Sequence, residues 1–182
     1  RNLGVIRKLK HVLPSQTLLS LYNTLILPHL QYCVLTWGNT FRTYLNKIHI
    51  VQKKALRLIN NSSYRSHAGP LFLKFNCLDI FDIYKYHLGV LMYKFYSRSL
   101  PTAIQSMFTL NSTIHNYHTR SSSKFHIFGA RTYFFKSTVR HQGPILWNSL
   151  NCLPCTYCLR KILKSIYSPV MLVNNCPLII TA

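Results

Sequence analysis

The sequence predicts a mainly α-helical protein: a helical bundle, followed by an irregular, partly extended C-terminal extension with short helices. Apolar residues recur at intervals of three and four in several segments of the first hundred positions, which is the period of an amphipathic helix. Residues 111–124 are instead polar and turn-rich. Of the 182 residues, 48% are hydrophobic and 13% aromatic, which is enough apolar surface to form a core.

Residues 1–100 are predicted to form one helical domain. Residues 1–10 have the pattern of an amphipathic helix, and Ser15 is well placed to cap a second helix that Pro28 breaks or kinks. The apolar positions of this second helix are Leu18, Leu19, Tyr22, Leu25 and Ile26.

A further helix over about residues 41–60 is predicted to have two different faces. Its apolar positions are Tyr44, Ile48, Val51, Ala55 and Leu58. Its other side carries Lys47, Lys53, Lys54 and Arg57. Such a basic side can be merely solvated, but no acidic residues are available to pair these charges, and we therefore favour contact with nucleic acid.

The next helix is predicted to begin at Asp79. Asp79 and Asp82 fit an N-cap and a first-turn acid that faces the positive end of the helix dipole. The apolar face of this helix comprises Ile80, Tyr84, His87, Leu88, Leu91 and Phe95. Helices with short connections such as these indicate a bundle.

The chain changes character after Pro101. Residues 101–124 are predicted to be a linker or loop, and residues 125–182 a basic C-terminal extension. Within the extension, Tyr133–Phe135 is expected to be a strand, and Gly143–Leu150 a short helix with Pro144 in its first turn. Residues 165–182 carry no charge and two prolines, and we expect them to be disordered.

The charge balance indicates a polyanionic partner. Lysine and arginine number 22 against two acidic residues, which gives a formal net charge of +20. Nucleic acid is a better candidate for this partner than a membrane surface. The stretch between Lys10 and Arg42 has no Lys, Arg, Asp or Glu, but its polar residues and Pro28 favour a buried core helix over a membrane span.

The same balance argues against catalysis by this chain. A two-metal polymerase or nuclease needs at least two convergent carboxylates, and the chain has only Asp79 and Asp82, which are expected to serve the helix start. No glycine-rich phosphate loop is present, and no acidic residue lies near a histidine to complete a nucleophilic triad. We therefore predict no catalytic residues and no cofactor in this chain.

Cys152, Cys155 and Cys158 are evenly spaced and suggest half of a zinc module. A structural zinc ion needs four ligands, and the next cysteine, Cys176, lies 18 residues beyond Cys158. We therefore expect no metal site and keep these four cysteines as the weaker alternative. Six cysteines without a secretory signal predict reduced thiols in an intracellular protein, either nuclear or cytoplasmic.

Four sequence blocks resemble one known family. They are residues 18–38 (LLSLYNTLILPHLQYCVLTWG), residues 45–59 (LNKIHIVQKKALRLI), residues 116–120 (NYHTR) and residues 143–150 (GPILWNSL). In this order they resemble the region that follows the polymerase palm in reverse transcriptases of jockey-like non-LTR (LINE-type) retrotransposons. The resemblance covers about residues 1–150 and ends near Asn151, where the family usually continues with proline and a polar, basic helix.

The resemblance implies the thumb and C-terminal region of an RNA-directed DNA polymerase. The fingers, the palm and the aspartates that hold Mg²⁺ in the parent polymerase would then belong to a missing N-terminal portion. A thumb grips RNA, DNA or an RNA–DNA hybrid through phosphate contacts, which are independent of sequence and sensitive to salt. The residues predicted to make such contacts are Arg7, Lys8, Lys10, Lys47, Lys53, Lys54 and Arg57, with Tyr117, Arg120 and Lys124 adding backbone contact and base stacking.

Two alternatives remain open from the sequence. The chain can be an independent RNA-binding protein with a zinc-stabilised C-terminus, in which case purified protein contains stoichiometric zinc that is lost on Cys155→Ser. It can also be an inert remnant of a decayed element, in which case it shows neither cooperative unfolding nor salt-dependent binding to a duplex.

Overall fold

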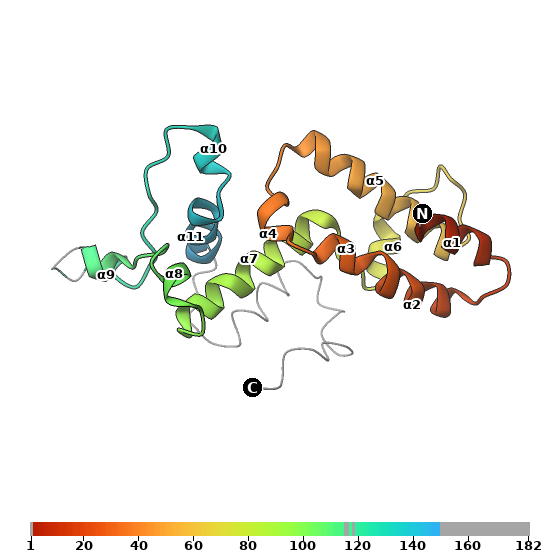
Figure 1. Cartoon of the computed structure of the whole chain (residues 1–182). Helices are drawn as coiled ribbons and strands as arrows, with labels where there is room; N and C mark the ends of the chain where they lie inside the picture. Colours follow the sequence, from red (N-terminus) through yellow and green to blue (C-terminus); the bar gives the residue numbers. More distant parts are fainter. Residues whose placement is uncertain (1, 115–116, 118, 150–182) are drawn as a thin grey trace. The chain divides into compact units, whose positions relative to one another are not determined.

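The computed structural model describes residues 2–114, 117 and 119–149. These residues are mainly helical, as predicted (Figure 1). The chain divides into two compact units, one that ends at His87 and one that begins at Leu88. This division falls inside a single helix, α7 (Ile80–Tyr96), and differs from the predicted boundary at residue 100.

The first unit contains the helices that the apolar periodicity predicted, together with short helices over residues 34–37 and 69–74 that it did not predict. In chain order they are α1 (Asn2–Leu9), α2 (Ser15–Leu25), α3 (Leu27–Gln31), α4 (Val34–Trp37), α5 (Arg42–Ile59), α6 (Gly69–Lys74) and the first turns of α7. The predicted break at Pro28 is confirmed, because α2 ends at Leu25 and Pro28 lies in the first turn of α3. A proline is tolerated there because the first backbone N–H groups of a helix have no partner within it.

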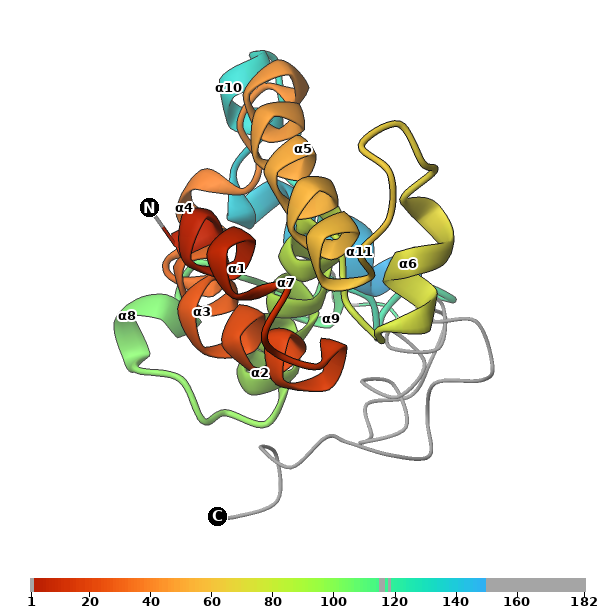
Figure 2. The same ribbon diagram turned by 90° about the vertical axis from the view of Figure 1, so that its right-hand side faces the viewer.

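The core of the first unit lies where α1, α2 and α5 meet (Figure 2). Ile6, Leu18, Tyr22 and Leu56 are each at most 2% exposed. Burial of such side chains contributes roughly 1.5–3 kcal/mol each, which is far more than the intrinsic helix propensity of these segments supplies. α1 and α5 are therefore held side by side, and the basic residues of both helices lie on the same packed unit.

Two sequence predictions for this unit were wrong in detail. Ser15 does not cap α2, since Pro14 occupies the N-cap position and no side chain there accepts a hydrogen bond. The buried stripe of α5 is displaced by about one residue, because Tyr44 and Val51 are 59% and 43% exposed whereas Leu45 is buried. The displacement arises because Gln52, which is polar, occupies a fully buried position in the stripe.

Gln52 is held in the core by the hydrogen bonds that its side-chain nitrogen donates. Its Nε2 donates to the Tyr22 hydroxyl oxygen at 3.2 Å and to the Leu78 carbonyl oxygen at 3.3 Å. Burial raises the pKa of Tyr22 to about 12, even though the hydrogen bond from Gln52 works in the opposite direction. A buried polar group that is paired in this way connects α2 and α5 with the segment before α7.

The second unit contains the rest of α7 and several shorter helices. These are α8 (Thr102–Gln105), α9 (Asn111–Ile114), α10 (Tyr133–Lys136) and α11 (Val139–Ser149). The predicted strand at Tyr133–Phe135 was wrong, because these residues form α10, whose N-cap Thr132 accepts a hydrogen bond from the Phe135 N–H at 3.3 Å. The helix expected from Gly143 begins earlier, at Val139, so that Pro144 lies inside α11 rather than in its first turn.

Aromatic side chains form the core of the second unit. Phe108, Phe125 and Trp147 are buried together with Met92 of α7. The ring centroids of Phe125 and Trp147 lie 6.1 Å apart in an edge-to-face arrangement, which is favourable for aromatic quadrupoles. Gly143 of α11 fits against this core so closely that a Cβ atom there would lie 2.7 Å from the Met92 sulfur.

The segment predicted as a linker is tied into this unit. An isolated antiparallel bridge joins Leu110 to Phe125, and the His126 N–H donates to the Thr109 carbonyl oxygen at 2.9 Å. Asn148 of α11 holds the same strand-like segment, since its amide group accepts from the Phe125 N–H at 3.0 Å and donates to the Phe125 carbonyl oxygen at 2.9 Å. Within residues 143–150, Trp147 thus packs in the core and Asn148 makes hydrogen bonds to the backbone of Phe125.

Candidate nucleic-acid interface

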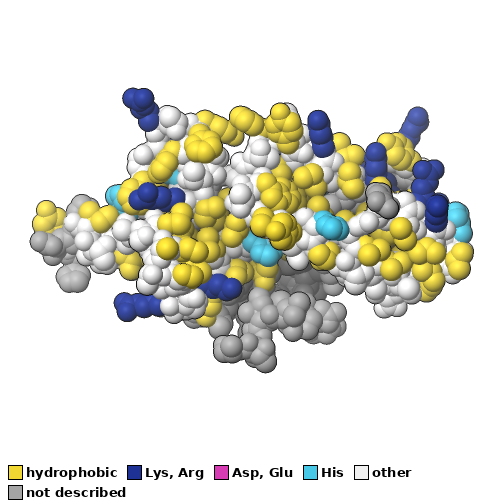
Figure 3. All heavy atoms as spheres, in the orientation of Figure 1, with side chains coloured by type: hydrophobic (Ala, Val, Ile, Leu, Met, Phe, Trp, Pro, Cys, Tyr) yellow, Lys and Arg dark blue, Asp and Glu magenta, His cyan; other side chains and the backbone are white. Residues whose placement is uncertain are grey.

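The basic residues predicted on the first helical domain lie on α1, on the turn after it, and on α5. We call this set the basic surface, and it comprises Arg7, Lys8, Lys10, Lys47, Lys53, Lys54 and Arg57. α1 contacts α5 directly, so the two groups of charges belong to one packed unit. In Figure 3, Lys and Arg side chains gather over α1 and the adjoining part of α5.

Helical geometry explains why α5 presents charge to solvent. Lys47 and Lys54 are seven residues apart, which places them on one face, about half a turn from the stripe of Leu45, Gln52 and Ile59. Lys47 is exposed, and its Nζ lies 5.7 Å from the centroid of the Tyr44 ring. The exposed Tyr44, which sequence periodicity assigned to the core, thus accompanies a cation of the basic surface.

Two members of the basic surface are held by the loop after α5. The Arg57 Nε donates to the Ser66 carbonyl oxygen at 2.8 Å, and the Lys54 Nζ lies 5.9 Å from the Tyr64 ring centroid. An Arg guanidinium has further N–H groups beside Nε, so this bond orients Arg57 without using all its donors. Both residues therefore have a structural role in addition to the predicted contact with phosphate.

Lys10 connects the two helices through a weaker contact. Its Nζ lies 3.5 Å from the Asn61 side-chain oxygen, at the exposed end of α5. Exposed contacts of this length contribute little to stability, so Lys10 can leave Asn61 for an anionic partner at small cost.

The two acidic residues of the chain do not neutralise this surface. Asp79 caps α7 by accepting from the Asp82 N–H at 2.8 Å, and Asp82 pairs with Lys85 at 3.2 Å. The predicted roles of both carboxylates as N-cap and first-turn acid are thus confirmed. Burial, together with the neighbouring Asp79, raises the pKa of Asp82 above its ordinary value.

His49 lies on α5 and feels the charges of Lys53, Asp79 and Asp82. Its ring stacks on Phe72, with the centroids 5.7 Å apart, and meets the edge of Phe81 at 5.5 Å. Burial lowers the pKa of His49, and the positive charge of Lys53 lowers it further. His49 is therefore neutral at pH 7 and adds nothing to the charge of the basic surface.

The other predicted contact residues belong to the second unit. Tyr117, Arg120 and Lys124 are exposed, and Tyr117 is 75% exposed. The Lys124 carbonyl oxygen accepts from the Asn111 N–H at 3.0 Å, which fixes the end of the loop that carries these side chains. The second unit contains no acidic residue, since both aspartates precede Leu88.

One basic residue of α5 was missed by sequence reasoning. Arg42 is the first residue of α5, and its guanidinium lies 5.4 Å from the Phe81 ring centroid. Arg42 does not belong to the basic face formed by Lys47, Lys53, Lys54 and Arg57. It could have been identified only if the first residue of the helix had been known.

No known protein family, curated protein or solved structure significantly matches this chain. What the basic surface can do therefore follows from its own charges and geometry. An array of cations on packed helices, without carboxylates among them, suits the phosphate backbone of a nucleic acid.

The predicted alternative zinc ligands Cys152, Cys155, Cys158 and Cys176 lie outside the described residues, as does the tail 165–182. Within residues 2–149, as far as they are described, no group of three or more His, Cys, Asp or Glu residues is arranged to hold a metal ion. Among the described helices, none is both long enough and apolar enough to cross a bilayer.

Proposed function

We propose that this chain is the non-catalytic, C-terminal part of a retrotransposon RNA-directed DNA polymerase, and that its basic surface grips template–primer nucleic acid. The observation that carries the proposal is the packing of α1 against α5, with cationic side chains on both helices and no acidic residue on either. The resemblance of four sequence blocks to non-LTR reverse transcriptases supports the polymerase context.

The grip would act through phosphate groups rather than bases. Lysine and arginine neutralise backbone charge and release condensed counterions, which gives affinity without sequence specificity. Six phosphate contacts would give a slope of about −5 when the logarithm of affinity is plotted against the logarithm of salt concentration. RNA, DNA and RNA–DNA hybrids all present such a backbone.

Catalysis in this proposal belongs to the missing N-terminal portion of the polymerase. The palm there would supply the aspartates and the Mg²⁺ ions for nucleotide transfer, while this chain holds the duplex behind it. The protein would act inside the cell, in the nucleus or the cytoplasm, where such a template is found.

Binding of the full chain to a fluorescent RNA–DNA hybrid, measured over a salt series, tests the grip. We expect affinity to fall by orders of magnitude between about 50 and 200 mM salt. In the double variant Arg7→Ala/Lys8→Ala, the slope of log affinity against log salt concentration should become less negative by up to about 2. Each lost phosphate contact changes this slope by roughly 1.

Lys85→Gln is a control for the loss of one positive charge elsewhere on the same unit, because Lys85 lies on α7, where it pairs with Asp82, rather than on the basic surface. Its salt slope should equal that of the unaltered chain. Equal slopes for all three proteins would overturn the assignment of the grip to α1 and α5. The polymerase context fails separately if the DNA preceding the Arg1 codon encodes no palm with paired aspartates in any frame.

A further inference from the structure

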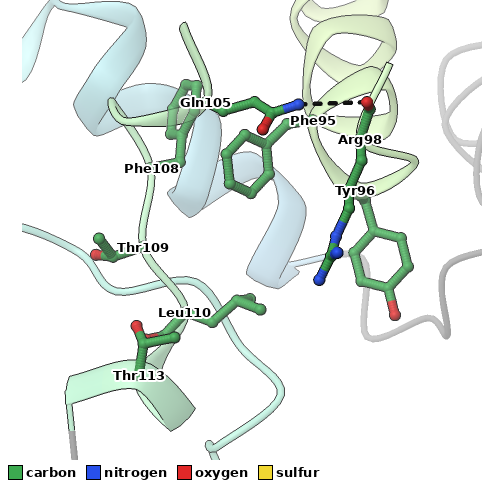
Figure 4. A pocket seen from close by; sticks show the side chains of 8 residues that line it. All are labelled: Phe95, Tyr96, Arg98, Gln105, Phe108, Thr109, Leu110 and Thr113. Atoms are coloured by element: carbon green, nitrogen blue, oxygen red, sulfur yellow. Dashed lines mark hydrogen bonds between the residues drawn. The ribbon is translucent and has the colours of Figure 1, made fainter. Parts of the chain in front are cut away.

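The second unit contains an open pocket of about 520 Å³ beside the C-terminal end of α7 (Figure 4). This volume is within the usual range for sites that bind small molecules. Most of its wall is apolar and comes from Phe95, Tyr96, Phe108 and Leu110. None of the residues in its wall belongs to the basic surface, so the proposed grip does not account for it.

Three aromatic side chains contribute to the wall of the pocket. The Phe95 ring meets the edges of Phe108 and Phe125, with centroid distances of 5.2 and 5.3 Å. Tyr96 stacks on Trp147 at 6.4 Å. In Figure 4 the Phe95 ring and the Leu110 side chain border the same space, which leaves an apolar slot suited to a flat ring.

Arg98 supplies a positive charge at this slot. Figure 4 shows its guanidinium directed between Tyr96 and Leu110. The second unit has no aspartate or glutamate, because Asp79 and Asp82 both precede it in the sequence. A ligand that combines a planar ring with a negative charge therefore matches the pocket, and a cationic ligand does not.

The backbone of Arg98 has a left-handed conformation at the C-terminal end of α7. Its φ is 53°, the left-handed conformation that glycine adopts most easily after the end of a helix. The Arg98 N–H donates to the Phe95 carbonyl oxygen at 3.0 Å, and the Gln105 amide donates to the Arg98 carbonyl oxygen at 3.2 Å. Glycine is the residue that adopts this backbone conformation at the lowest cost, so the arginine at this position can be replaced by glycine without strain.

We propose that this pocket binds one unpaired nucleotide, with its base between Phe95 and Leu110 and its phosphate on the Arg98 guanidinium. The inference rests on the proposed function for the source of the ligand, which is a single-stranded end of the gripped nucleic acid. A free nucleotide has the same chemistry and is the other source.

Two variants of the full chain test the pocket. Arg98→Gly removes the charge and relieves the strained backbone, so its melting temperature should rise by about 2–4 °C. Thr113→Trp places a large side chain at an exposed position of the pocket wall and should fill the slot. Arg131→Gly, which also removes one exposed charge of the second unit, is the matched control.

The probes are a blunt duplex, the same duplex with a single-stranded overhang, and adenosine monophosphate. The overhang should tighten binding to the unaltered chain by about five- to 150-fold, as expected for one stacked base. Arg98→Gly and Thr113→Trp should lose this gain and keep their affinity for the blunt duplex, while Arg131→Gly should keep both. If adenosine monophosphate abolishes the tighter binding that the overhang gives, free nucleotides also enter the pocket.

The outcomes separate the two proposals. If the blunt duplex binds with the expected salt dependence but both pocket variants retain the overhang gain, the pocket assignment is wrong and the grip stands. If the blunt duplex does not bind, the grip fails, and a single-stranded oligonucleotide that binds the unaltered chain but neither pocket variant would still support the pocket.

Discussion

Gly38 shows how a single residue can fix the packing of the first unit. It follows α4, has an ordinary helical φ of −71°, and is buried. A Cβ atom at this position would lie 2.6 Å from Tyr84 Cδ2 and even closer to the Val34 carbonyl oxygen. Glycine is therefore needed here for lack of space rather than for backbone freedom.

Gly38→Ala should accordingly destabilise the protein by about 2–3 kcal/mol, because the obstructing Val34 atom belongs to the backbone and cannot rotate away. Gly4→Ala is the comparison, since a Cβ atom there meets nothing within 4 Å. Gly4→Ala should stabilise α1 by about 0.5–1 kcal/mol. Chemical denaturation of both variants measures the difference, and equal effects would contradict this account of Gly38.

Elements differ in how far the sequence predicts them. The long amphipathic helices α2, α5 and α7 follow from their apolar period, because burial of one face decides them. The register of α5 could not be predicted, since the partners of the Gln52 side-chain nitrogen are Tyr22, far away in the chain, and the Leu78 carbonyl. The helix at Tyr133–Lys136 was also missed, because a segment of four residues is too short to show whether its apolar residues follow the period of a helix or of a strand.

The same limit applies to the candidate site. Composition and helical period located Lys47, Lys54 and the basic residues of α1 without any structure. The hydrogen bond from Arg57 to the Ser66 carbonyl oxygen depends on the conformation of the loop after α5, and no repeating pattern in the sequence predicts that conformation. The pocket beside Arg98 was beyond prediction, because its wall combines α7 with the segment of Phe108 and Leu110, and that pairing arises from tertiary folding.

The start of α7 permits a test at the scale of one helix. Asp79→Ala removes the acceptor of the Asp82 N–H and should cost about 1 kcal/mol of unfolding free energy. Asp79→Asn keeps an acceptor while it removes the charge, and should stay within a few tenths of the unaltered chain. If both variants lose the same stability, the charge of Asp79 rather than its hydrogen bond supports α7.

At the scale of the whole molecule, the net charge of +20 opposes folding through self-repulsion. Screening extends over about 10 Å at 0.1 M salt and becomes shorter as salt is added. The two salt effects on this protein therefore have opposite signs: salt weakens the grip on nucleic acid and strengthens the fold.

The melting temperature of the free protein should consequently rise between about 50 and 200 mM potassium chloride, the range over which affinity for a duplex falls. Arg7→Glu/Lys8→Glu lowers the net charge and should flatten this rise. Differential scanning fluorimetry measures both trends, and a melting temperature that falls with salt would show that self-repulsion is not the dominant charge effect.

The hydrogen bonds of Asn148 with Phe125 have a consequence for the order of folding. The two residues are 23 positions apart, so the intervening chain must close into a loop before either bond can form. Loop closure costs conformational entropy that two hydrogen bonds do not repay alone. We expect the two Asn148 hydrogen bonds to form together with the contact between Phe125 and Trp147, so that the second unit folds cooperatively rather than as a sum of its short helices.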